Sequence, residues 1–364
     1  MALWRAPFVA PLLGWGIVAR LCLGMTPLAL LLLVRSEGSS YAAAGGVAAA
    51  YTVAVGAGSP VAGRLVDRRG RARALVPRAL AYSVLLCAVA VLAVAAAAAG
   101  FFLPPVGASL RTLLPAIVPG ELRSIVFALE ASLQEVFFVG GPLLVAVLAA
   151  IRPFAALLGA AVTACIGTLA LVRVPPMRET PPTGGGSPTW IGALGAPGVR
   201  TIITLAVFMG LGFGPVEVAL PAFAEQHGSR ALAGLALAAF SAGSLAGGLI
   251  IGLRSGIDDR TRVLLFSTVL PAALALPLLA DSIPAMCALM FAAGLPIAPL
   301  IAGAYGLVER VAPEGTHAET FAWIATAITS GIALTASANF FSQASEWSAL
   351  STDTNTEMPS PILF

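Results

Sequence analysis

Long hydrophobic runs, separated by short polar connections, make up most of the chain. Each run is about twenty residues long, the length that a helix needs to cross the hydrocarbon core of a bilayer. The runs predict eleven transmembrane helices, at residues 11–34, 41–62, 76–97, 100–118, 124–149, 153–173, 200–223, 231–253, 262–280, 284–308 and 318–338. The pattern therefore predicts an all-α membrane protein.

The composition supports this prediction. Hydrophobic residues make up 59% of the chain and charged residues 10%, and the mean hydropathy is +0.95. Soluble domains contain about 25% charged residues, so this composition argues against a soluble fold. The first run follows Arg5, as in a secretory signal peptide, but it is longer than the apolar part of such a peptide. We interpret it as the first transmembrane helix.

One connection, residues 174–199, is longer than the others and is rich in proline and glycine. Such a composition predicts a flexible linker. It divides the chain into an N-terminal six-helix bundle (1–173) and a C-terminal bundle of five helices (200–338). The apolar pattern ends after about Ala338, so we expect residues 339–364 to form a disordered polar tail.

Short motifs recur in the two halves in the same order. Residues 57–59 (Ala-Gly-Ser) match residues 242–244, and residues 127–128 (Phe-Ala) match residues 321–322. The repeats indicate one duplicated six-helix unit. A twelfth helix would complete the second copy, so the sequence predicts either that the usual ending has been lost or that the chain is a natural short variant.

Arginine supplies all the basic residues, and its distribution predicts the orientation. With the N-terminus in the cytoplasm, the inner segments hold fifteen arginines and the outer segments three. Positively charged loops stay on the cytoplasmic side of a membrane. We therefore expect a multi-pass protein of the cell membrane whose N-terminus and 174–199 linker are cytoplasmic.

The most highly charged stretch, residues 63–75, contains five arginines and Asp67 between two apolar runs. These charges are not stable in hydrocarbon, so the stretch is predicted to be a short aqueous loop between helices 2 and 3. Gly63 is expected to end the preceding helix and to let another backbone come close. Gly70 is expected to form the tight turn before the next helix.

The pattern of this loop, G-x-L-x-D-R-x-G-R-x-R, resembles the loop between helices 2 and 3 of the major facilitator superfamily of secondary transporters. A generic positively charged loop would explain the arginines but not Asp67 and the two glycines. The resemblance implies a fold of two bundles, with six and five helices here. It also implies that the loop takes part in gating, through Gly63, Asp67, Arg68, Gly70 and Arg71.

By the same resemblance, Asp67 would meet the start of helix 11, near residues 314–319, when the cytoplasmic side is closed. A carboxylate at a helix N-terminus is favourable, because it faces the positive end of the helix dipole. Arg68 and Arg71 would then bridge to Glu319 across the two halves.

A few charged residues lie within the predicted spans: Arg20, Arg111, Glu130, Glu135 and Glu217. Each costs about 2.5–3.5 kcal/mol on insertion scales, so each needs a partner or a water-filled cavity. Similar depth predicts an Arg111–Glu130 pair and an Arg20–Glu135 pair, whereas no arginine lies level with Glu217. We expect these five residues to line a substrate or proton pathway; alternatively, the pairs only hold helices together.

Gly141 and Pro142, in helix 5, resemble a fragment of the antiporter signature of the same superfamily. Only the Gly-Pro core of that signature is present. A simple kink of the helix is the alternative explanation.

Other kinds of chemistry find no support in the sequence. His227 and His317 lie in different loops and the four cysteines are widely spaced, so neither a metal site nor a cofactor is predicted. The clustered acidic metal site of a membrane-embedded transferase is missing, so we expect no enzyme. Nucleic-acid binding is not expected either, because the arginines lie in membrane turns.

The sequence therefore predicts a monomeric secondary transporter that exports a small, partly apolar compound in exchange for protons. Two alternatives remain open. The protein imports its substrate together with protons, or it is a remnant that no longer transports because its last helix is missing.

Overall fold

The computed structural model describes residues 6–89, 94–179, 191–227, 231–252 and 257–353. Some side chains within the helices, including those of Glu135 and Glu217, lie outside the described set. The helices are α2 (Val9–Ser36), α3 (Tyr41–Arg69), α4 (Arg71–Ala88), α5 (Val94–Phe101), α6 (Val106–Ile117), α7 (Arg123–Ala149), α8 (Pro153–Arg173), α9 (Pro175–Glu179), α10 (Pro197–Gln226), α11 (Ala231–Gly252), α12 (Asp259–Ala275), α13 (Ile283–Gly294), α14 (Ile297–Val311) and α15 (His317–Asp353). Short 3₁₀ turns are η1 (Gly120–Leu122), η2 (Gly192–Gly195) and η3 (Leu276–Leu279).

The prediction of an all-α membrane protein is confirmed, since the regular structure of the described residues is helical throughout. Nine stretches of this part of the chain are long and apolar enough to cross a membrane. The protein is therefore a multi-pass membrane protein. The α4 and α15 helices are not among the nine, and α4 carries three arginines within its 18 residues. The count of eleven spans thus stays a prediction.

Prolines break two of the predicted helices at corresponding places. The fourth predicted helix consists of α5 and α6, separated at Pro104-Pro105, and the tenth consists of α13 and α14, separated at Pro296. Proline lacks the N–H that continues the helical hydrogen bonds. The predicted end of the third helix at residue 97 was wrong, because α4 ends at Ala88 and Val94 already begins α5.

The expected boundary at residue 338 was also wrong for the part of the tail that the structure describes. The α15 helix continues to Asp353, whereas residues 354–364 lie outside the described residues. No glycine or proline interrupts the sequence between Gly331 and Pro359. A helix can therefore propagate past the point where its sequence becomes polar, because helix propagation needs no apolar side chains.

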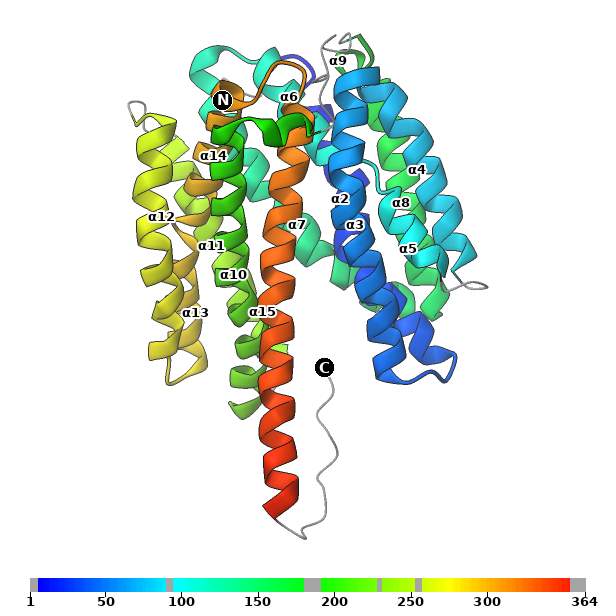
Figure 1. Cartoon of the computed structure of the whole chain (residues 1–364), viewed down its shortest axis with the longest axis vertical. Helices are drawn as coiled ribbons and strands as arrows, with labels where there is room; N and C mark the ends of the chain where they lie inside the picture. Colours follow the sequence, from blue (N-terminus) through cyan, green and yellow to red (C-terminus); the bar gives the residue numbers. More distant parts are fainter. Residues whose placement is uncertain (1–5, 90–93, 180–190, 228–230, 253–256, 354–364) are drawn as a thin grey trace.

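The helices form two bundles, α2–α8 and α10–α15. In Figure 1 α3, α4, α5 and α8 lie on one side, α10–α14 lie on the other, and α7 and α15 lie between them. Within them the helices pack in equivalent pairs. The α2 helix contacts α7 as α10 contacts α15, and α3 contacts α5 as α11 contacts α13. The duplication inferred from the sequence motifs is thus repeated in the packing.

Equivalent glycines stand at two of these helix contacts. Gly24 of α2 faces the backbone at Gly141 of α7, and Gly210 of α10 faces the backbone at Gly331 of α15. A side chain at any of the four would collide with the partner's main chain, so each glycine permits close helix packing. Gly141 is therefore a packing residue, and the α7 helix runs continuously through Pro142.

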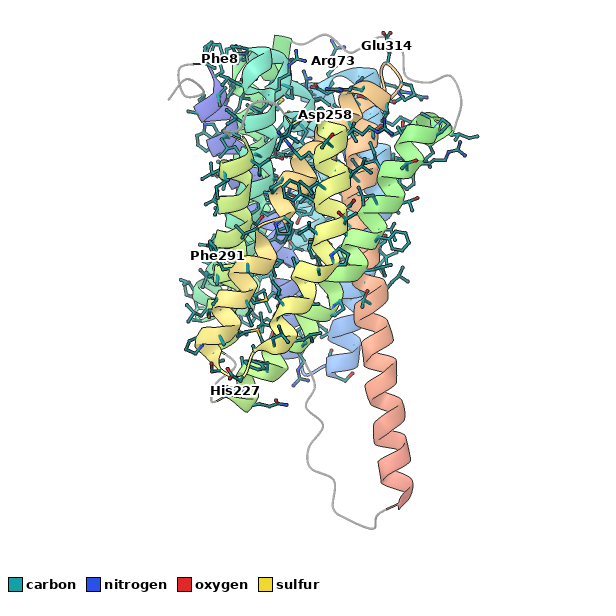
Figure 2. All side chains as sticks on the ribbon, turned by 90° about the vertical axis from the view of Figure 1, so that its left-hand side faces the viewer. Phe8, Arg73, His227, Asp258, Phe291 and Glu314 are labelled. Carbon is teal, nitrogen blue, oxygen red and sulfur yellow. The ribbon has the colours of Figure 1, made fainter. Side chains whose placement is uncertain are left out.

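Both bundles meet along α3 and α15, and along α7, α11 and α14. We call the end of the molecule that holds the α3–α4 turn the loop end. Figure 2 shows Phe8, Arg73, Asp258 and Glu314 at this end and His227 at the opposite end. The α3 and α15 helices lie together at the loop end and diverge toward the opposite end (Figure 1).

Candidate functional site

A cluster of charged side chains is buried inside the N-terminal bundle. It joins Arg20 of α2, Arg111 of α6 and Glu130 of α7, which are 2%, 6% and 0% exposed. The Arg20 Nη1 donates to both carboxylate oxygens of Glu130, at 2.8 and 3.0 Å. The Arg111 Nε lies 3.1 Å from Oε1 of the same carboxylate. One glutamate thus serves as counter-charge for two arginines.

The predicted Arg111–Glu130 pair is present, and Arg20 binds the same carboxylate. The predicted Arg20–Glu135 pair stays a prediction. The Arg20 Nε also donates to the carbonyl of Gly16, at 3.0 Å, so this side chain is directed toward the start of α2. Side chains in a helix lean toward its N-terminus. Arg20 therefore reaches a shallower carboxylate than the depth of its backbone suggested. The side chain of Glu135 lies outside the described residues.

Aromatic rings cover the two guanidinium groups. The Cζ of Arg111 lies 4.5 Å from the centre of the Tyr305 ring, and that of Arg20 lies 5.1 Å from the centre of the Phe137 ring. Such contacts stabilise cations that have left water. The described side chains of the cluster carry two positive charges and one negative charge, and the Arg20 Nη2 has no hydrogen-bond partner among them. The arrangement can accept a further anionic or hydrogen-bond-accepting group.

Tyr305 connects this cluster to the other bundle. It belongs to α14 and makes edge contacts with Phe127 of α7 and Phe321 of α15, at centroid distances of 5.9 and 5.4 Å. Its hydroxyl accepts a long hydrogen bond from Gln134 of α7, at 3.5 Å. Because Tyr305 belongs to the C-terminal bundle, movement of one bundle against the other would uncover Arg111.

Asp67 lies where the resemblance placed it, at the start of α15. Its two carboxylate oxygens accept hydrogen bonds from the backbone N–H groups of Ala318 and Glu319, at 3.1 and 2.9 Å. Free N–H groups and the helix dipole both favour a carboxylate at this place. The carboxylate is 5% exposed, so this contact seals the seam between the bundles at the loop end.

The expected ion pair with Glu319 is present, but the prediction of its arginine partner was wrong. Arg64, not Arg68 or Arg71, donates to both oxygens of Glu319, at 2.6 and 3.0 Å. Arg64 is one helical turn before Asp67 on α3, so both side chains face α15. Arg71 instead donates to the hydroxyl of Thr112, at 3.2 Å, and Arg68 is exposed.

Each of the two loop glycines has a distinct role. Gly70 has a φ of 83° and breaks the chain between α3 and α4, as predicted. Gly63 does not end the helix, because α3 continues to Arg69. It does admit another backbone: an added Cβ would lie 2.5 Å from the carbonyl oxygen of Ala318 and 2.7 Å from the Cα of Glu319.

The linker takes part in the same contact, although its composition predicted a flexible segment. The N–H of Ala193, in η2, donates to Oε1 of Glu319 at 3.3 Å. Gly192 has a φ of 58°, and a Cβ there would collide with the side chains of Glu319 and Arg64. The apolar stretch Ile191, Ala193 and Leu194 within a proline- and glycine-rich linker was the available signal that this segment packs.

We expect Gly192→Ala to weaken the closure of the loop end, because the new methyl group would displace the Arg64–Glu319 pair and the backbone is in the left-handed region. Faster modification of a cysteine at buried position 318 by a maleimide, with the four native cysteines replaced, would report this. Gly195→Ala in the same turn is the matched control, since nothing lies within 4 Å of a Cβ there. Equal labelling rates in the two variants would contradict this role.

Glu217 and the question of a metal site remain to be described. The backbone of Glu217 belongs to α10, but its side chain lies outside the described residues. Among the side chains that are described, no group of three histidine, cysteine, aspartate or glutamate residues lies close enough to hold a metal ion.

Comparison with known proteins extends this picture. A family model described as Major Facilitator Superfamily matches residues 12–228 and 202–350. No curated protein matches the sequence significantly. Several solved structures are similar to the chain as a whole.

One is a bacterial homologue of the iron transporter ferroportin in an outward-facing state, with 16% identity, 91% coverage of both chains and a TM-score of 0.68. Another is the human organic anion transporter MFSD10, with 13% identity, 92% coverage of both chains and a TM-score of 0.69. A third is the proton:xylose symporter XylE, with 10% identity, coverage of 93% of this chain and 90% of that one, and a TM-score of 0.64. At these identities the likeness shows the fold.

Proposed function

The chain belongs to the major facilitator superfamily, and from this premise we propose that it exports a small, partly apolar compound across the cell membrane in exchange for protons. The family and the fold identify a membrane transporter, as the pattern of residues 63–75 predicted. Substrate, direction and coupling ion belong to the proposal. The similar structures do not decide them, because their names refer to iron, an organic anion and xylose.

The observation that carries the proposal is the buried Arg20–Glu130–Arg111 cluster under Tyr305 of the other bundle. Alternating access requires a site whose cover belongs to the half that moves. When Tyr305 moves away, the carboxylate that two arginines share can release one arginine and bind a proton or a substrate in its place. We therefore assign Arg20, Arg111 and Glu130 to the substrate or proton pathway, together with Glu135 and Glu217.

The contacts at the loop end support a gate in this mechanism. The α3 helix is held against the start of α15 by Asp67 and by Arg64, which takes the role expected for Arg68 or Arg71. Gly63 lets the two helices come close, and Gly70 forms the turn after α3. The arginine distribution supports a cytoplasmic location of this end. The conformation described here is then closed to the cytoplasm, and these contacts break when the site opens inward. We expect the monomer to be the working unit.

The test is flux in proteoliposomes with an imposed pH gradient, followed with a trapped pH-sensitive dye while partly apolar test compounds are added. Proton movement in the direction opposite to that of the compound supports exchange. Proton movement in the same direction as the compound supports proton-coupled import. We expect Glu135→Gln to abolish the flux while the protein still inserts and folds, because a proton carrier must ionise.

The matched control is Glu314→Gln, which removes an exposed carboxylate in the α14–α15 turn. Unchanged flux in Glu135→Gln would reject the role of Glu135. Absence of flux from the wild-type protein with every compound would favour a remnant without transport activity.

A further inference from the structure

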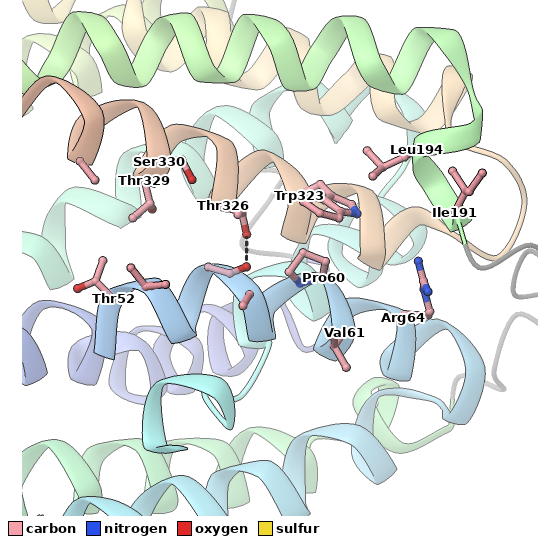
Figure 3. A pocket seen from close by; sticks show the side chains of 14 residues that line it. Thr52, Pro60, Val61, Arg64, Ile191, Leu194, Trp323, Thr326, Thr329 and Ser330 are labelled. Carbon is pink, nitrogen blue, oxygen red and sulfur yellow. Dashed lines mark hydrogen bonds between the residues drawn. The ribbon is translucent and has the colours of Figure 1, made fainter. Parts of the chain in front are cut away.

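A groove runs along the seam between α3 and α15, apart from the charged cluster (Figure 3). Its volume is about 660 Å³, which lies within the range of small-molecule sites. Val53 and Val61, which are 73% and 51% exposed, belong to its lining, so the groove opens to the molecular surface. Both bundles and the linker line it, through residues that include Ala57, Pro60, Ile191, Leu194, Trp323 and Thr326.

Most of the groove wall is apolar, and three of its four hydroxyl groups are engaged, while the fourth belongs to Ser330. The threonine hydroxyls in its wall donate to backbone carbonyls: Thr52 to Ala48 at 2.9 Å, Thr326 to Gly56 at 3.0 Å and Thr329 to Ala325 at 3.0 Å. A polar ligand such as a sugar would need donors along its whole length. The wall therefore favours a hydrocarbon chain.

Donors are concentrated at the loop end of the groove. The Trp323 Nε1 is buried and has no hydrogen-bond partner among the described residues. Figure 3 shows this nitrogen directed toward the end where Arg64 and Leu194 lie. Arg64 is bound to Glu319, yet its side chain remains 30% exposed. A buried N–H without an acceptor costs free energy, so an acceptor is expected beside it.

The length of the groove matches one leaflet of a bilayer. Its α3 wall extends from Thr52 to Arg64, about 18 Å at 1.5 Å per residue. Half of the hydrocarbon core is about 15 Å thick. Arg68, Arg69 and Arg73 are exposed at the same end, where they would lie at the level of the lipid head groups.

We infer that a phospholipid from the leaflet at the loop end occupies this groove. One acyl chain lies along α3, and the phosphate accepts a hydrogen bond from the Trp323 Nε1 beside Arg64. Because the lining comes from α3, α15 and the linker, the bound lipid joins the two bundles in the conformation that is closed at this end. The inference does not depend on what the protein transports or in which direction.

Native mass spectrometry of the full chain tests this site. The protein is stripped of lipid in detergent and titrated with phosphatidylglycerol, and the Kd of the first bound lipid is measured. Ala57→Phe fills the groove from an exposed position and is expected to weaken this first binding at least about tenfold. Ala272→Phe, at an exposed alanine of α12 in the other bundle, is the matched control and is expected to bind as the wild type does.

Trp323→Phe tests the head-group end, because it keeps an aromatic ring and removes the N–H. Loss of one hydrogen bond to a charged acceptor is expected to raise the Kd about tenfold. Equal affinities of Ala57→Phe and Ala272→Phe would overturn the site. A wild-type Kd in Trp323→Phe would overturn the position of the phosphate. Since the assay measures binding alone, failure of the proposed transport function would not change these outcomes.

Discussion

Glu130→Ala is expected to lower the stability of the protein by about 3–5 kcal/mol, because it leaves Arg20 and Arg111 without their shared counter-charge. Both guanidinium groups are at most 6% exposed, so water cannot replace the carboxylate. Thermal unfolding of the purified protein in detergent would show the loss as a large fall in melting temperature. Transport should be lost together with stability.

The control for this prediction is Glu309→Ala. Glu309 also pairs with an arginine, Arg123, but at 3.6 Å and with side chains that are 31% and 50% exposed. Exposed pairs contribute about 0–1 kcal/mol, so this variant should melt close to the wild type. Similar melting temperatures of the two variants would mean that the buried cluster has another source of negative charge.

Gly63→Ala is expected to open the loop end. The added methyl group would lie 2.5 Å from a backbone oxygen of α15, and a main chain cannot yield as a flexible side chain does. The α3 and α15 helices must therefore separate, which breaks the hydrogen bonds of Asp67 to the start of α15. The population of the protein closed at the loop end should fall.

Spin labels at positions 73 and 314, both exposed at the loop end (Figure 2), would measure this change as longer distances, with the four native cysteines replaced. Gly56→Ala is the matched control, since it makes the same substitution on the same helix. Its Cβ would lie 3.6 Å from the side chain of Thr326, an ordinary contact. The prediction is wrong if both variants give the wild-type distance distribution.

The two predictions concern different parts of one mechanism. Glu130 holds the charges inside the N-terminal bundle, whereas Gly63 determines how closely the two bundles approach each other. A variant that opens the loop end without loss of stability would show that the gate and the cluster can be changed separately. Interfaces between packed bundles tend to be bistable, so small steric changes at the seam can shift the whole equilibrium.

The sequence by itself determined the features that depend on neighbouring residues. Hydropathy located most of the helices, and the breaks at Pro104-Pro105 and Pro296 follow from the missing N–H of proline. The turn at Gly70 follows from its backbone freedom, and the position of Asp67 follows from a motif. The equal depth of Arg111 and Glu130 could be read from the sequence because a short turn joins their helices.

Only the tertiary structure decided which distant groups meet. Arg20 binds Glu130, Arg64 binds Glu319, and Gly192 of the linker lies against that second pair. The partners in these two ion pairs lie more than 100 residues apart in the chain, and the reach of a long arginine side chain is set by its rotamer. Hydrophobic periodicity fixes the depth and the face of a helix, but not its rotation against a helix of the other bundle, and that rotation selects the partner of each charge.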